Sequence, residues 1–214
     1  GGSGSDASSK RETDTVLSAS GTLSVQHLDY KHTVTPSVQG VVSSGDDEEL
    51  SATSDNAALL AMMSVGKSAA ISAGVDPNNT TGTITWNFNS STEYFDYLNL
   101  GEELTLTYTI RASDNQAGSA DHDVVITITG TNDAPVVARA ITSTAAEAAA
   151  SYDVDLLFGA TDADAGETAL LTVANVTYTV DTVQTGSSGA VLPAGITRTD
   201  DTLSVDPTDA VFNS

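Results

Sequence analysis

Side chains that bear oxygen gather at two places in patterns that suit a hard cation. Asn132 and Asp133 follow a strand-like run and precede Pro135, and Asp162 and Asp164 are spaced two residues apart in a later loop-like stretch. On an extended backbone, residues i and i+2 project to the same side. Ca²⁺ takes roughly six to eight oxygen ligands from carboxylates, amides and carbonyls. The pattern indicates a joint between two domains that is held by a cation.

Two further carboxylates are candidates for the same joint. Glu102 stands at the start of a strand that would lie beside the last strand of the first domain, and Glu12 precedes the first strand. The alternative interpretation is that the Asp and Asn side chains only form Asx-turns. Five other acids are weaker candidates because single carboxylates are more often solvated surface: Glu103, Glu147, Asp153, Asp155 and Glu167.

Alternating apolar and polar residues predict the strands that position these groups. Leucine, tyrosine and isoleucine alternate with threonine over 104–110, and valine and isoleucine alternate with threonine over 124–129, as in half-buried strands. Strands are predicted at 21–26, 33–42, 82–89, 104–111 and 123–129, with a hairpin loop at 114–118 and one helical turn over 57–63. The first domain is therefore predicted to be all-β.

The second half carries fewer strand signals. Runs at 138–144, 152–157, 170–180 and 196–205 are predicted strands. The fold class expected for the whole chain is all-β, with two immunoglobulin-like antiparallel β-sandwiches in tandem. Such a sandwich needs about 100 residues, and no second copy of the 100–130 hairpin follows Phe212. We expect the second sandwich to be incomplete.

Composition narrows the function. The net charge is −22, from 7 basic and 29 acidic residues, so nucleic acid and anionic membrane surfaces are unfavourable partners. The chain has no cysteine, and bound metal is a common substitute for disulfides in small extracellular domains. No stretch is long enough for a transmembrane helix, and no signal peptide is visible. Residues 1–11, which begin Gly-Gly-Ser-Gly-Ser, are expected to be a flexible linker or a cloning remnant.

The motifs resemble one family. Leu100-Gly101-Glu102 and Gly130-Thr131-Asn132-Asp133-Ala134-Pro135 are its most specific pieces, and the segments 56–65, 82–89 and 94–98 extend the likeness. The chain resembles the cadherin-like, VCBS-type repeats of large RTX-type adhesins of Gram-negative bacteria. The resemblance implies a complete repeat at 12–135 and a partial second repeat at 136–214. It also implies a calcium site at the joint, formed by Glu102, Asn132, Asp133, Asp162 and Asp164.

The resemblance implies a function as well. It makes the chain a structural extender of a secreted adhesin at the cell surface. Calcium would stiffen this extender, which would serve adhesion and biofilm formation. Its partners would be neighbouring repeats, with host or biofilm ligands bound through other domains, and no insertion into a membrane is expected.

Two alternative hypotheses assign the chain a function other than that of an extender. In the first, the chain is a glycan- or peptide-binding module, with Trp86, Phe88, Tyr94, Phe95 and Tyr97 as a stacking platform. In the second, it is a hydrolase domain, which would need paired carboxylates in a cleft that the sequence does not show. No catalytic residues are predicted. At 27–32 the chain departs from the family, and His27, Asp29 and His32 are an alternative transition-metal set.

Overall fold

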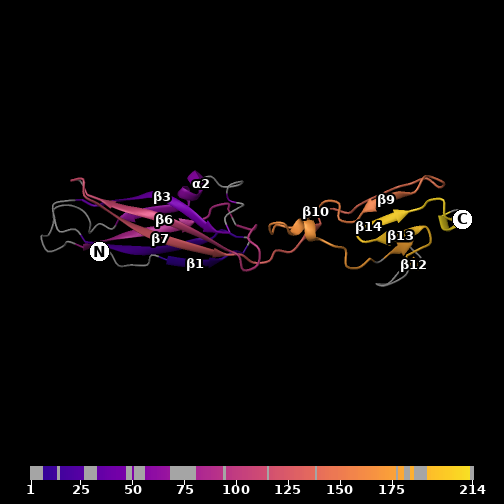
Figure 1. The fold of residues 1–214 in the computed structure, drawn as a ribbon, viewed down its shortest axis with the longest axis horizontal. Coiled ribbons are helices and arrows are strands. Elements are labelled where there is room, and N and C mark those ends of the chain that lie inside the picture. Colours follow the sequence, from indigo (N-terminus) through magenta and orange to yellow (C-terminus); the bar gives the residue numbers. More distant parts are fainter. Residues whose placement is uncertain are drawn as a thin grey trace. The chain divides into compact units, whose positions relative to one another are not determined.

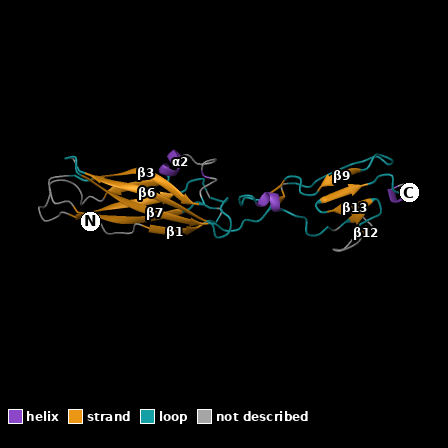
Figure 2. Cartoon of the chain, in the orientation of Figure 1, coloured by secondary structure: helices purple, strands orange, loops and turns teal. Residues whose placement is uncertain are grey.

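A computed structural model describes most of the chain. The described residues are 7–13, 15–26, 33–46, 50, 56–67, 81–93, 95–114, 116–137, 139–176, 178–180, 184–185 and 192–212. The chain divides into two compact units, Gly1–Asp133 and Ala134–Ser214. The division falls two residues before the predicted boundary of 135/136. Both units consist mainly of strands and loops, as predicted (Figure 2).

The first unit is built from two sheets. One sheet has the order β1-β7-β6-β3, in which β1 is parallel to β7 and the other pairs are antiparallel. The other sheet has the antiparallel order β2-β5-β4. Figure 1 shows β3, β6, β7 and β1 side by side in the first unit. The strands are β1 (Ala7–Arg11), β2 (Ser18–Gln26), β3 (Thr35–Gly45), β4 (Met63–Lys67), β5 (Thr81–Asn89), β6 (Glu103–Ser113) and β7 (Ser119–Thr129).

One apolar core lies between the two sheets. Period-two alternation sends every second side chain of β6 and β7 inward, so Leu106 and Ile126 are buried while Thr105 and Thr127 are half-buried on the outer face. From the other sheet, Ile84, Trp86 and Phe88 of β5 and Leu23 of β2 enter the same cluster. The predicted strands of the first domain and their inward faces are confirmed.

Local chemistry fixes the connections. The β6–β7 hairpin closes through Asp114, whose Oδ1 accepts hydrogen bonds from the backbone N–H groups of Gln116 and Gly118 at 2.8 and 2.7 Å. The predicted helical turn is α2 (Asn56–Ala61), which contributes the buried Leu59 to the core. It is the longest helix among the described residues, and no helix there is long and apolar enough to cross a membrane.

The second unit has short strands. A three-stranded antiparallel sheet has the order β13-β14-β9, and two strand pairs, β10-β8 and β11-β12, lie outside it. These strands are β8 (Val136–Val137), β9 (Tyr152–Asp155), β10 (Ala160–Thr161), β11 (Thr179–Val180), β12 (Gln184–Thr185), β13 (Ile196–Thr199) and β14 (Thr202–Val205). The only buried residues in the part of this unit that is described are Asp164 and Pro207. A packed apolar core like that of the first unit is thus absent from those residues.

Four sequence predictions need correction. Residues 7–11, assigned to a flexible linker, form β1, which pairs with β7 from Ala7↔Val125 to Arg11↔Thr129. The predicted strand at 196–205 is a hairpin of β13 and β14, because the backbone turns at Asp200 with φ 51°. The described residues 139–144 contain no strand, and β11 is the only strand among the described residues of 170–180.

Candidate metal centre

Three carboxylates of the second unit converge on one point. A carboxylate oxygen from each of Asp162, Asp164 and Glu167 lies within 4.8 Å of the other two. Asp164 is 2% exposed, and the other two are half-buried. Across all the described residues, this is the only such group of three metal-ligating side chains. The structure therefore brings together Asp162 and Asp164, as predicted, and adds Glu167.

A compact turn holds these groups in place. The backbone N–H of Asp162 donates to the Thr168 hydroxyl at 2.8 Å, and this hydroxyl donates to the Asp162 carbonyl at 3.1 Å. The N–H of Asp164 donates to the Asp162 carboxylate at 3.1 Å. Gly166 takes the left-handed conformation with φ 79° and starts the 3₁₀ turn η2 (Glu167–Leu170). This turn reverses the backbone and places Glu167 beside the aspartates.

The electrostatics of this group favour a cation. Two like charges about 4 Å apart repel by about 1 kcal/mol in water and by about 4 kcal/mol in a protein-surface environment. A divalent cation turns this repulsion into attraction, and carboxylates at such separations are hard-cation ligands. Three carboxylates supply only part of a calcium shell, so backbone carbonyls, amides or water must complete it.

The end of the first unit gathers other predicted residues. The N–H of Glu12 donates to the Thr129 carbonyl at 2.8 Å, and the Glu12 carboxylate accepts from the Thr131 hydroxyl at 2.8 Å. The N–H of Gly130 donates to the Glu102 carbonyl at 2.9 Å. Glu12 is fully buried, at 0% exposure. These bonds draw the segments that carry Glu12, Glu102 and the Asn132–Asp133 pair to one end of the first unit.

The side chains at this end do not all face the same point. The Glu102 carboxylate accepts hydrogen bonds from the backbone and side-chain amides of Asn99 at 3.0 and 3.1 Å, so it closes its own turn. The Asn132 side chain is exposed, and its amide donates to the Asp133 carbonyl. Asp133 is half-buried. Asn132, Asp133 and the Glu12 carboxylate therefore lie at the C-terminal end of the first unit, but their side chains do not form one cluster with Glu102.

The structure does not support the aromatic stacking platform as a binding site. Trp86, Phe88 and Phe95 are at most 1% exposed, and Tyr97 packs against the same core, so these four aromatic side chains form no exposed sugar platform. Tyr94 and the set His27, Asp29 and His32 lie outside the described residues.

Sequence reasoning ranked Glu167 too low. The signal was present in Asp162-Ala-Asp164-Ala-Gly166-Glu167, because a glycine after two spaced aspartates permits a sharp turn that returns the next acid to them. Comparison with known proteins adds no assignment. A scan against protein-family models and a search of curated proteins each found no match.

Proposed function

We propose that this chain is a non-catalytic extender segment of a secreted bacterial surface adhesin. It is built from immunoglobulin-like, cadherin-like repeats, and Ca²⁺ stiffens the link between them. The observation that carries the proposal is the convergence of Asp162, Asp164 and Glu167 in one turn. Such a turn has the ligand chemistry of calcium and offers no nucleophile or general base paired with a substrate cleft.

The strand order of the first unit supports an immunoglobulin-like sandwich. With the strands lettered A to G in chain order, that fold pairs B, E and D in one sheet and C, F and G in the other. The sheets β2-β5-β4 and β3-β6-β7 have this order. Strand β1 takes the place of A and joins the second sheet by parallel pairing with β7. The order supports the fold without the disulfide of antibody domains, since the chain has no cysteine.

The second unit repeats half of this pattern. Its sheet β13-β14-β9 pairs the strands in the same sense as β4-β5-β2. In the first unit the sheet β2-β5-β4 is covered by the sheet that contains the β6–β7 hairpin. The correspondence supports tandem repeats of one fold, the second of which is only partly represented by the described residues.

Calcium at the joint is the part of the proposal that concerns rigidity. The ligands expected from the sequence are Glu12, Glu102, Asn132 and Asp133 in the first unit, and Asp162 and Asp164 in the second, where Glu167 lies beside them. A net charge of −22 makes the metal-free chain self-repelling, and bound divalent cations reduce that charge. Extracellular calcium is abundant enough to fill weak sites of this kind.

The experiment is a calcium titration combined with a distance measurement between the units. Since the chain has no cysteine, Ser44→Cys and Thr199→Cys, both at exposed positions, give one spin label in each unit. We expect saturable calcium binding by calorimetry and a distance distribution that narrows in calcium and broadens in chelator. No heat of binding, together with the same distribution in both conditions, overturns the proposal.

A further inference from the structure

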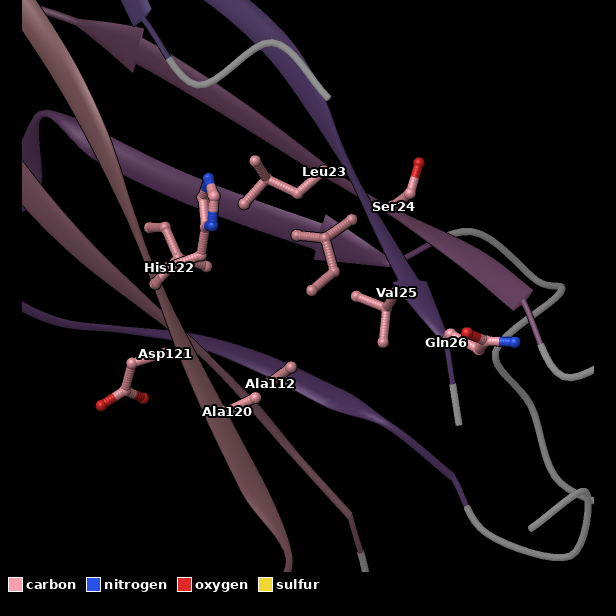
Figure 3. Close-up of a pocket in the computed structure, with 10 residues that line it drawn as sticks. Leu23, Ser24, Val25, Gln26, Ala112, Ala120, Asp121 and His122 are labelled. Carbon is pink, nitrogen blue, oxygen red and sulfur yellow. The ribbon is translucent and has the colours of Figure 1, made fainter. Parts of the chain in front are cut away.

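One end of the first unit contains a cavity between its two sheets. Its volume is about 350 Å³. The cavity lies among β2, β5, β6 and β7, far along the strands from the turn at Gly130. Figure 3 shows Leu23 and Val25 on one wall, and Ala112, Ala120 and His122 on the other.

The cavity follows from the register of β6 and β7. Along this pair, the inward positions face each other as Leu104↔Ile128, Leu106↔Ile126, Tyr108↔Val124, Ile110↔His122 and Ala112↔Ala120. The first three layers are large and fully buried. The last layer is two methyl groups, although the strands stay paired as far as Ser113↔Ser119. Strands β6 and β7 therefore extend beyond their last pair of large inward side chains.

In the opposite sheet, too, the inward residues become smaller toward this end. Val25 of β2 pairs with Gly82 of β5, two residues beyond the buried layer of Leu23 and Ile84. Both sheets therefore place small residues at the same end of the sandwich. Among the described residues, the side chains therefore leave this space open, and Ala120 in its wall is exposed to solvent. Its walls are made of regular sheet, which gives a fixed shape.

The lining defines the chemistry of a ligand. The inward side chains are aliphatic except for His122, which is half-buried. The carboxylate of Asp121 points away from the cavity and binds Arg111 on the outer face (Figure 3). Cavities of about 300–1,000 Å³ with apolar walls and few polar groups are typical of small-molecule sites. The charge of −22 disfavours anions.

We propose that this cavity binds a small, uncharged and mainly apolar molecule with an aryl or short alkyl body. Such a site would add ligand binding to a segment whose proposed role is mechanical. It needs no calcium, so its test is independent of the extender function.

The test uses the whole chain and the neutral probe N-phenyl-1-naphthylamine. Amide and methyl NMR shifts show where the probe binds, which fluorescence alone cannot do because the second unit exposes apolar side chains such as Leu170, at 74%. We expect saturable shifts at residues 23–25, 110–112 and 120–122. Ala112→Leu fills the cavity and should weaken this binding by about tenfold or more, because the added isobutyl group occupies the ligand's space.

Ser113→Leu is the matched control, since its position on the same strand alternates to the outer face. It should leave the affinity within about twofold of the parent chain. Thermal melting checks that both variants stay folded. The proposal is overturned if the probe causes no saturable shifts at these residues, or if Ala112→Leu binds as tightly as the parent. It is also overturned if both variants lose binding equally.

Discussion

The hydroxyl of Tyr108, at the centre of β6, donates a hydrogen bond of 2.8 Å to the backbone carbonyl of Leu59 in α2. The tyrosine is fully buried, and burial raises the pKa of its hydroxyl. Its ring packs at a tilt against Phe88 of the opposite sheet, with 6.2 Å between ring centroids. One side chain therefore ties the helix and both sheets of the first unit together.

Tyr108→Phe keeps the ring packing and removes this hydrogen bond. We expect the free energy of unfolding of the first unit to fall by about 1 kcal/mol. The loss stays near this value because the Leu59 carbonyl also accepts from the N–H of Met62 at 3.2 Å. Urea denaturation followed by Trp86 fluorescence measures it. Tyr152→Phe in the second unit is the control and should leave this transition unchanged. An unchanged midpoint for Tyr108→Phe would show that the bond contributes nothing net.

Substitutions at two glycines with positive φ measure the cost of backbone strain with and without a steric clash. Gly45 has φ +91°, and a Cβ there would lie 2.2 Å from the Glu103 carbonyl oxygen. Gly101 has φ +85° with no atom within 4 Å of the same position. Gly101→Ala should cost about 1 kcal/mol from strain alone. Gly45→Ala should cost about 2–4 kcal/mol, because the β3–β6 pairing must also shift. Equal losses in chemical denaturation would contradict the clash.

The charges of Asp162 and Asp164 should lower the stability of the second unit in chelator and raise it in calcium. Asp162→Asn with Asp164→Asn keeps the side-chain oxygen that accepts the Asp164 N–H, but it removes two charges. In chelator the double variant should be as stable as the parent or more so, because like-charge repulsion falls. In calcium at about 100 times its Kd, the parent should gain about 2.7 kcal/mol and the variant little of it.

Melting curves of the second unit in calcium and in chelator measure both effects. The control is Asp200→Asn, an exposed change at the β13–β14 turn, which should retain the full calcium response. A calcium gain that survives in the double variant would place the ion elsewhere.

A fourth prediction concerns the ion pair of Arg111 and Asp121 on the outer face of β6 and β7. Their side chains join through two hydrogen bonds of 2.7 Å. The hydrogen bonds from Arg111, together with its positive charge, hold the pKa of Asp121 below its ordinary value. The pair therefore stabilises the folded state above the unfolded pKa of about 3.9, and this contribution is lost as the pH falls through the folded pKa.

Arg111→Ala should raise the pKa of Asp121 in a carboxyl NMR titration, because the hydrogen bonds and the positive charge that lower it are removed. Asp206 is the internal control, because hydrogen bonds from Thr208 lower its pKa independently of Arg111. If Asp121 titrates in the variant as in the parent chain, the pair has no electrostatic effect in solution.

The sequence predicted what depends on neighbours along the chain. Alternation in β6 and β7 identified both strands and their inward faces, because side-chain direction in a strand has a period of two. It missed β1, whose residues Ala-Ser-Ser-Lys-Arg show no apolar alternation and are held by pairing with β7. It also merged β13 and β14, although Asp200 and Asp201 marked the turn between them.

The candidate site shows the same limit. Asp162 and Asp164 were predicted together from spacing alone, whereas Glu167 joins them through the left-handed backbone of Gly166. The Glu102 carboxylate bonds to Asn99, which motif resemblance does not reveal. A shared motif locates a segment, but competing hydrogen bonds decide where a carboxylate points.

The last prediction concerns the difference in packing between the units. The inward residues of 104–110 and 124–128 are at most 1% exposed, whereas Val154, Leu203 and Val205 on the central sheet of the second unit are only half-buried. Buried contacts govern local opening, so amide hydrogen exchange should be slow across 104–129 and much faster across 196–205. If a hairpin from another molecule completes the sheet, protection at 196–205 should rise with protein concentration. Equal protection of both regions in a strict monomer would show that the second unit is a complete short fold.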